Sequence, residues 1–148
     1  MIITIFKRMF LFVAVSIFSF NLHAADWTMA SGYPKSNFHT QNIIKFIDDV
    51  KSTTSVNINL NPNDTLIKLD AIKTSLQRGQ IPIGEIRLGI YGNEDPMYIL
   101  AGLPFIAPDY SSAWLLKDVQ MEYLQEKFDK KGLMILYTAP WPGQGFYT

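Results

Sequence analysis

The 148-residue chain contains no cysteine and only two histidines, His23 and His39. The absence of cysteine excludes a disulfide scaffold, thiol catalysis and cysteine-ligated metal. Two histidines are too few for an ordinary zinc site, so we expect neither a metal nor another cofactor. Charge of one sign is also lacking, because 13 basic side chains balance 13 acidic ones. A chain without basic excess has little with which to neutralise phosphates, which argues against a nucleic-acid partner.

Motifs of the common enzyme classes are absent too. The chain has no Gly-x-Ser-x-Gly sequence, no glycine-rich phosphate loop and no His-Glu-x-x-His sequence, so we predict a non-catalytic protein. Intrinsic disorder is excluded, because 48% hydrophobic and 14% aromatic residues are enough to build a core. A chain of this length suits one domain of ordinary size.

The first 24 residues have the regions of an export signal. Lys7 and Arg8 form a short positive region, the run Met9–Phe20 is apolar apart from two serines, and small residues follow it. An apolar run of about 12 residues is too short for a membrane-spanning helix, which needs about 20. We therefore predict a signal peptide over 1–24, cleavage after Ala24, and a mature chain over 25–148 in the bacterial periplasm. The alternative is an uncleaved membrane anchor.

After this segment, strand and helix patterns alternate along the chain. Strand patterns have apolar side chains at alternate positions or in short continuous runs, whereas helix patterns have them three and four residues apart. The predicted strands are Trp27–Ala30, Val56–Leu60, Ile81–Ile90 and Leu133–Tyr137. Four helices are predicted. The first two have apolar faces over Ile43–Val50 and Leu66–Leu76, a short third begins at Asp95-Pro96, and a longer fourth extends over Ser111–Lys131.

Capping residues and large side chains refine this assignment. Asn37 or Ser36 can cap the first helix, and Gly79 and Gly132 close the second and the last. Leu133–Tyr137 is apolar throughout, as expected of a strand buried on both faces. The side chains that we expect to pack in the interior are Trp27, Phe105, Trp114, Leu116, Val119, Tyr123 and Phe128.

This order of elements predicts an α/β fold, in which a sheet carries helices on both faces. Such sheets bind ligands at the carboxyl ends of their strands, where the amino termini of helices also point. The stretch Pro140–Thr148 is rich in glycine and proline and leads away from the last predicted strand. We therefore expect the domain to be incomplete.

Several stretches of the chain, taken in order, resemble one family. They are Ser31–Thr40 (SGYPKSNFHT), Leu76–Glu85 (LQRGQIPIGE), Asn93–Pro96, Ala101–Ile106 (AGLPFI) and Leu136–Thr148 (LYTAPWPGQGFYT). These stretches are similar to the opening, the helix–glycine–strand junction, the Leu-Pro-Phe element and the Trp-Pro turn of TRAP-transporter periplasmic solute receptors of the dicarboxylate-receptor type. The resemblance extends through the mature chain but covers only the N-terminal half of such a receptor.

The resemblance implies both a fold and a function. It implies the front lobe of a type II periplasmic-binding-protein-like fold, with a central mixed sheet flanked by helices. The implied function is to capture a small organic anion, a carboxylate, and to deliver it to the membrane permease subunits of a TRAP system. The arginine that clamps the ligand carboxylate in this family belongs to the half that is absent here, so we expect a truncated form.

The resemblance and the strand-end rule together select candidate ligand-binding residues. Tyr33, Asn37 and His39 lie between the first strand and the first helix, Glu85 follows Gly84, and Trp141 and Gln144 follow the last predicted strand. Each has a structural alternative. Asn37 can be a plain cap and His39 can face solvent. Glu85 can pair with Arg87 or face solvent, and Trp141 can pack against the absent lobe.

Two alternatives to a receptor stay open at this point. One is a small secreted α/β hydrolase-like enzyme that uses His39 together with an acid. The other is an interaction module with the same half-fold and no role in transport.

Overall fold

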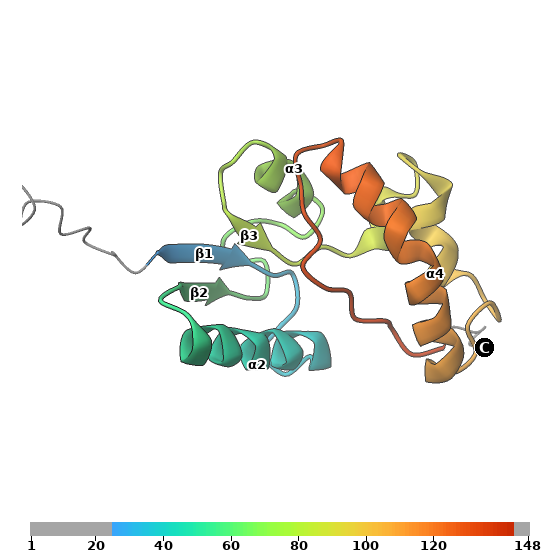
Figure 1. Cartoon of the computed structure of the whole chain (residues 1–148), viewed down its shortest axis with the longest axis horizontal. Helices are drawn as coiled ribbons and strands as arrows, with labels where there is room; N and C mark the ends of the chain where they lie inside the picture. Colours follow the sequence, from blue (N-terminus) through green and yellow to red (C-terminus); the bar gives the residue numbers. More distant parts are fainter. Residues whose placement is uncertain (1–24, 144–148) are drawn as a thin grey trace, which may run out of the picture.

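The computed structural model describes residues 25–143 (Figure 1). The predicted signal peptide over 1–24 and the candidate residue Gln144 lie outside the described residues.

Three short strands form one parallel sheet, in the order β2-β1-β3. The central strand β1 is Asp26–Ala30, and its neighbours are β2, Asn57–Asn61, and β3, Ile83–Gly84. Trp27 pairs with Ile58, and Met29 pairs with Ile83. The predicted α/β class is confirmed, and both pairings in residues 25–143 are parallel, where we had expected a mixed sheet.

Helix α2, Phe38–Thr53, covers one face of the sheet (Figure 1). Its predicted cap is confirmed, because the Asn37 side chain accepts a hydrogen bond from the backbone N–H of His39 at 2.8 Å. The predicted apolar face is confirmed as well, since Ile43 is buried against Met29, Ile58 and Ile83. Trp27 packs against this cluster, as expected.

Helix α3, Ile72–Gln77, is shorter than predicted. Gly79 follows it with φ at +66°, as a closing glycine should. The first predicted turn does not form, because the Asp64 side chain accepts a hydrogen bond from the N–H of Leu69 and so stabilises a non-helical turn. Ile72 is fully buried and packs against Ala30 and Ile81, so α3 contributes to a second core cluster.

The predicted strand Ile81–Ile90 is mostly wrong, because only Ile83–Gly84 pairs with β1. The N–H of Glu85 still donates to the carbonyl of Ala30 at 2.9 Å, and the chain then leaves the sheet. Leu88–Tyr91 forms the 3-10 helix η1. The apolar side chains of this stretch pack against Tyr91 and its neighbours in a third cluster, so their alternation reflects packing and not a ladder.

Two elements follow at the predicted places. The 3-10 helix η2, Pro96–Gly102, begins after Asp95, which caps it, and helix α4, Tyr110–Asp129, begins after Asp109. The buried face of α4 differs in part from the prediction. Phe128 is buried and Leu116 and Tyr123 are half-buried as expected, whereas Val119 is 72% exposed and Trp114 48% exposed. Phe105, at 68% exposed, is not an interior residue either.

The predicted last strand, Leu133–Tyr137, is wrong. Residues 133–143, which we call the crossing segment, form an extended stretch without a ladder that passes between the sheet and α4 (Figure 1). Met134 is 73% exposed and Leu136 is 52% exposed. A strand buried on both faces needs hydrogen-bonded neighbours, and no strand within residues 25–143 pairs with this segment.

The crossing segment joins the two halves of the fold. Leu133 and Ile135 pack against the cluster around Phe128, while the ring centroid of Tyr137 lies 5.3 Å from that of Phe46 on α2. Among residues 25–143, no helix is long and apolar enough to cross a membrane.

Candidate ligand-binding site

Two polar side chains meet at the carboxyl ends of β1 and β3. Ser31 comes directly after β1 and Glu85 directly after β3, and parallel strands bring these ends to the same edge of the sheet. The Ser31 hydroxyl donates a hydrogen bond to Oε2 of Glu85. Ser31 is fully buried. Sequence analysis missed this serine, and its signal was a small hydroxyl residue immediately after a buried strand.

Glu85 lies in surroundings that disfavour its charge. Burial raises the pKa of its carboxyl group, and the hydrogen bond from Ser31 lowers that pKa in part. The ion pair with Arg87 that we considered from the sequence does not form. Glu85 is therefore a partly buried acid whose only side-chain partner is neutral.

Four aromatic side chains form a cluster next to this pair. Tyr33, Phe38 and His39 come from the loop after β1 and the first turn of α2, and Trp141 comes from the crossing segment. We call these four residues the aromatic cluster. The Trp141 ring centroid lies 4.4 Å from that of His39 and 5.5 Å from that of Tyr33, in edge-on contacts. Such contacts are favourable, and they hold the crossing segment over the start of α2.

Two buried polar atoms within the aromatic cluster have no hydrogen-bond partner. They are Oη of Tyr33 and Nε2 of His39, and a third such atom, Oγ1 of Thr138, belongs to the crossing segment. Buried polar atoms are nearly always hydrogen-bonded, because an unmet hydrogen bond is costly. The free hydrogen-bonding capacity of these atoms, with Tyr33 close to the partly buried acid Glu85, makes this region the candidate ligand-binding site.

His39 is buried, with 6% of its surface exposed, so the solvent-facing alternative is wrong. Burial lowers the pKa of its imidazole. The ring is therefore neutral at neutral pH, with one nitrogen as donor and the other as acceptor.

Tyr33 lies close to both Glu85 and Arg87, because the charge of each acts on its hydroxyl. Burial raises the pKa of its hydroxyl, and the nearby Arg87 guanidinium lowers it in part. No hydrogen bond of acceptable geometry joins the two side chains. Arg87 is exposed and forms no ion pair with a described residue, so its positive charge is available beside the aromatic cluster.

The structure thus brings most of the sequence-predicted residues together. Tyr33, His39 and Trp141 are in mutual contact, and Glu85 acts electrostatically on Tyr33. The side-chain oxygen Oδ1 of Asn37 already accepts the capping hydrogen bond from the N–H of His39.

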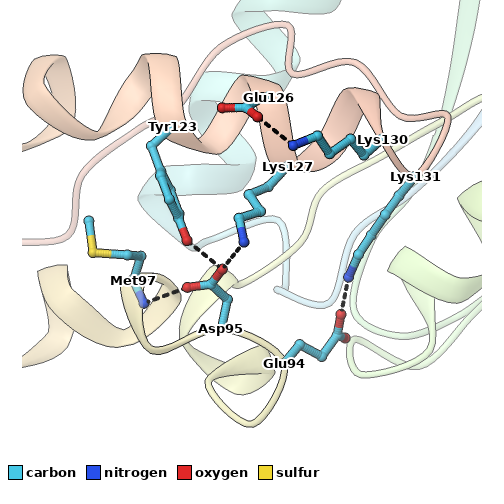
Figure 2. A network of polar contacts seen from close by, with 8 residues as sticks. All are labelled: Glu94, Asp95, Met97, Tyr123, Glu126, Lys127, Lys130 and Lys131. Atoms are coloured by element: carbon cyan, nitrogen blue, oxygen red, sulfur yellow. Dashed lines mark hydrogen bonds and ion pairs between the residues drawn. The ribbon is translucent and has the colours of Figure 1, made fainter.

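A second network of polar side chains lies around Glu94 and Asp95, and here the acids are paired (Figure 2). Buried Asp95 accepts hydrogen bonds from the Tyr123 hydroxyl at 2.7 Å and the Met97 N–H at 3.0 Å, and it pairs with Lys127 at 3.0 Å. The hydroxyl of Tyr123, the backbone N–H and the ammonium group together hold the pKa of Asp95 at about 2. Glu94 pairs with both Lys73 and Lys131. Each acid here has its partners, so this network fixes α4 against η2.

Two further features lie elsewhere. A hollow of about 310 Å³ is lined by Asp64, Lys68, Leu69, Asp70 and Ile90, and it shares no residue with the aromatic cluster. Within residues 25–143, no group of three or more His, Asp or Glu side chains is arranged to hold a metal ion.

No family model matches the chain, and no curated protein matches it. Solved structures do. The Bordetella pertussis extracytoplasmic solute receptor DctP6, described as binding pyroglutamic acid, is 39% identical with a TM-score of 0.77, over 80% of this chain and 40% of that one. DctP7 of the same organism, also described as binding pyroglutamic acid, is 34% identical with a TM-score of 0.76 over the same shares.

A third solved structure agrees with these two. It is a TRAP solute-binding protein from an unidentified microbe of a marine metagenome, described as specific for pyroglutamate. It is 32% identical with a TM-score of 0.77, over 82% of this chain and 41% of that one.

The fold is that of a lobe of a type II periplasmic-binding protein, with its polar groups gathered at the strand ends. Within that class, the resemblance to TRAP periplasmic solute-binding proteins that we predicted is confirmed in both sequence and structure. The chain spans about 40% of the length of the solved receptors that it matches.

Proposed function

We propose that this chain is the N-terminal part of the solute-binding component of a TRAP-type uptake system. The component captures a small organic acid in the periplasm and passes it to membrane permease subunits. The observation that carries this proposal is the 39% identity to a pyroglutamic-acid receptor over 80% of the chain. Pyroglutamate is the first candidate ligand, because the three receptors reported above are each described as binding it or as specific for it.

The proposed contacts come from the strand-end site. The ligand-binding residues are Tyr33, Asn37, His39, Glu85, Trp141 and Gln144. Unsatisfied atoms of Tyr33 and His39 support this set, as does the lone acid Glu85. No catalytic step is proposed, since the solved relatives are receptors and no described observation favours an enzyme. Loss of a hydrolytic activity in His39→Ala would reverse that view.

Binding by this chain alone should be weak. A chain that spans 40% of a receptor contacts the ligand from one side, whereas good sites bury most of the ligand surface. We expect a dissociation constant for L-pyroglutamate of about 1 mM, equivalent to roughly 4 kcal/mol. Ligand-observed NMR tolerates such affinities and is the direct test.

Matched variants make the test specific. His39→Ala should abolish the NMR signal of bound L-pyroglutamate, whereas Glu122→Ala, which changes an exposed acid on α4, should leave it unchanged. Equal binding by both variants would contradict the proposed site. Absence of binding to every organic acid tried would contradict the function for this chain.

Export is part of the same proposal. We propose a signal peptide over 1–24 and the N-terminal part of a solute-binding domain, a truncated one, over 25–148. Mass spectrometry of the periplasmic fraction should find a chain that begins at Ala25. A chain that retains Met1 would contradict the assignment.

A further inference from the structure

Ser31 is held rigidly at the end of β1. Its backbone N–H donates to the carbonyl of Asn61 at 3.0 Å, and its own carbonyl accepts from the N–H of Asp64 at 3.2 Å. The side chain is fully buried and donates to Glu85. Because the N–H of Glu85 is also bonded to Ala30, backbone and side chain both fix the position of this carboxylate.

This fixed carboxylate keeps unused capacity. An ionised carboxylate has room for about four hydrogen bonds, and Ser31 supplies one of them. The charged or titratable groups that face Glu85 are Tyr33 and Tyr137, on whose pKa values it acts, together with the neighbouring Arg87. None of them forms an ion pair or hydrogen bond with it. A partly buried anion in such a setting attracts a hydrogen-bond donor and repels a second anion.

We propose that Glu85, positioned by Ser31, accepts a hydrogen bond from an N–H of the bound organic acid and turns away a second carboxylate at the same place. This inference rests on the proposed function and names the class of ligand. The site then takes a monocarboxylate that also carries an amide N–H and disfavours dicarboxylates.

Three small organic acids separate the effect of the ligand N–H from the effect of a second carboxylate. L-pyroglutamate has a ring N–H, 5-oxotetrahydrofuran-2-carboxylate has a ring oxygen in its place, and glutarate has a second carboxylate. With the full mature chain, we expect L-pyroglutamate to bind about tenfold more tightly than the lactone, since hydrogen bonds to charged groups are strong. Glutarate should bind more weakly than either. Competition in ligand-observed NMR measures all three affinities.

Variants at Glu85 assign the preference to this side chain. Glu85→Gln keeps an acceptor but removes the charge. This variant should therefore retain most of the lactam preference, meaning the tighter binding of L-pyroglutamate than of the lactone, and it should bind glutarate better than the unaltered chain does. Glu85→Ala has no acceptor and should bind lactam and lactone within about twofold of each other. Glu122→Ala is the control for loss of an acid, and an unchanged NMR fingerprint verifies that each variant is folded.

Ser31 positions the Glu85 carboxylate and does not itself contact the ligand, so its role is tested by a measurement on Glu85. Ser31→Ala removes the hydrogen bond that lowers the pKa of Glu85. The pKa of Glu85, followed by carboxyl ¹³C NMR, should therefore rise, and the lactam preference should shrink. An unchanged pKa would show that Ser31 does not act on Glu85.

The outcomes separate this inference from the proposed function. If the unaltered chain binds lactam and lactone equally, the inference is overturned while the receptor function stands. The same holds if Glu85→Ala keeps the full lactam preference. If none of the three probes binds, this inference is overturned, and the receptor function is overturned as well if no other organic acid binds.

Discussion

The sheet half of the molecule and its C-terminal half bury their apolar side chains to different degrees. Over residues 26–84, strands and helices α2 and α3 close around buried clusters, and the large hydrophobics left exposed are Phe38 and Leu66. In the C-terminal half, after residue 84, many large apolar side chains remain exposed. They are Ile99, Leu103, Phe105, Ile106, Tyr110, Trp114, Leu115, Val119, Met134, Leu136, Tyr137 and Trp141.

The two halves therefore differ in how completely they bury their apolar side chains. The sheet half buries most of its large apolar side chains against residues of its own strands and helices. The C-terminal half is held by the network of polar contacts around Glu94 and Asp95 and by one modest cluster. Exposed apolar surface of this extent usually marks a contact region. The chain spans about 40% of the length of the solved receptors that it matches.

The largest expected effect is on stability and separates the two halves directly. Ile72→Ala, in the fully buried part of the sheet half, should lower the free energy of unfolding by about 2–5 kcal/mol. Val119→Ala, on the exposed side of α4, should change it by no more than about 0.5 kcal/mol. Urea denaturation followed by circular dichroism measures both. Equal losses at the two positions would show that the halves are packed alike.

The next effect concerns association. We expect the mature chain to self-associate and to bind hydrophobic dyes, because a large apolar surface favours both. Leu115→Lys combined with Val119→Lys should weaken association by about tenfold or more, since each buried large side chain contributes about 1.5–3 kcal/mol. Light scattering over a concentration series measures this. A monodisperse monomer that melts in one sharp transition and binds no dye would show that residues 25–148 form a complete domain.

A smaller effect separates two roles of Asn37. Asn37→Ala should lower the free energy of unfolding by about 1 kcal/mol, because the cap on the His39 N–H is lost. Asn37→Ser can still cap and should stay near the original stability. If Asn37 also contacts ligand, both variants should weaken L-pyroglutamate binding. Loss of affinity in Asn37→Ala alone would assign the residue to capping only.

The smallest effect tests how the second polar network holds the C-terminal half. The pKa of Asp95 is lowered from 3.8 to about 2, so its charged form stabilises the folded state above pH 4. That contribution is lost as the pH falls through 4 toward 2. The stability difference between the unaltered chain and Asp95→Asn should therefore shrink over this range. A difference that stays constant with pH would mean that the charge of Asp95 does not matter.

Local patterns predicted strands β1 and β2 and helix α2 well. The apolar spacing of Ile43–Val50 and the capping side chain of Asn37 are properties of a few consecutive residues, and both appear as predicted. The same is true of the alternation in Val56–Leu60 and of Gly79. The ordered family stretches also led to the right class of protein, because they are spread along the chain and depend on no single contact.

Only the tertiary structure decided the remaining features. Leu133–Tyr137 has the composition of a buried strand, yet a strand forms only where a neighbour offers its backbone, and no described strand does. The contact of Ser31 with Glu85 spans 54 positions in sequence, and Trp141 reaches His39 from the crossing segment. Local sequence determines the period and ends of a helix or strand because its hydrogen bonds and faces repeat within a few residues. Which segment lies beside which, and therefore which polar atoms are left unsatisfied, depends on long-range packing that no short stretch of sequence encodes.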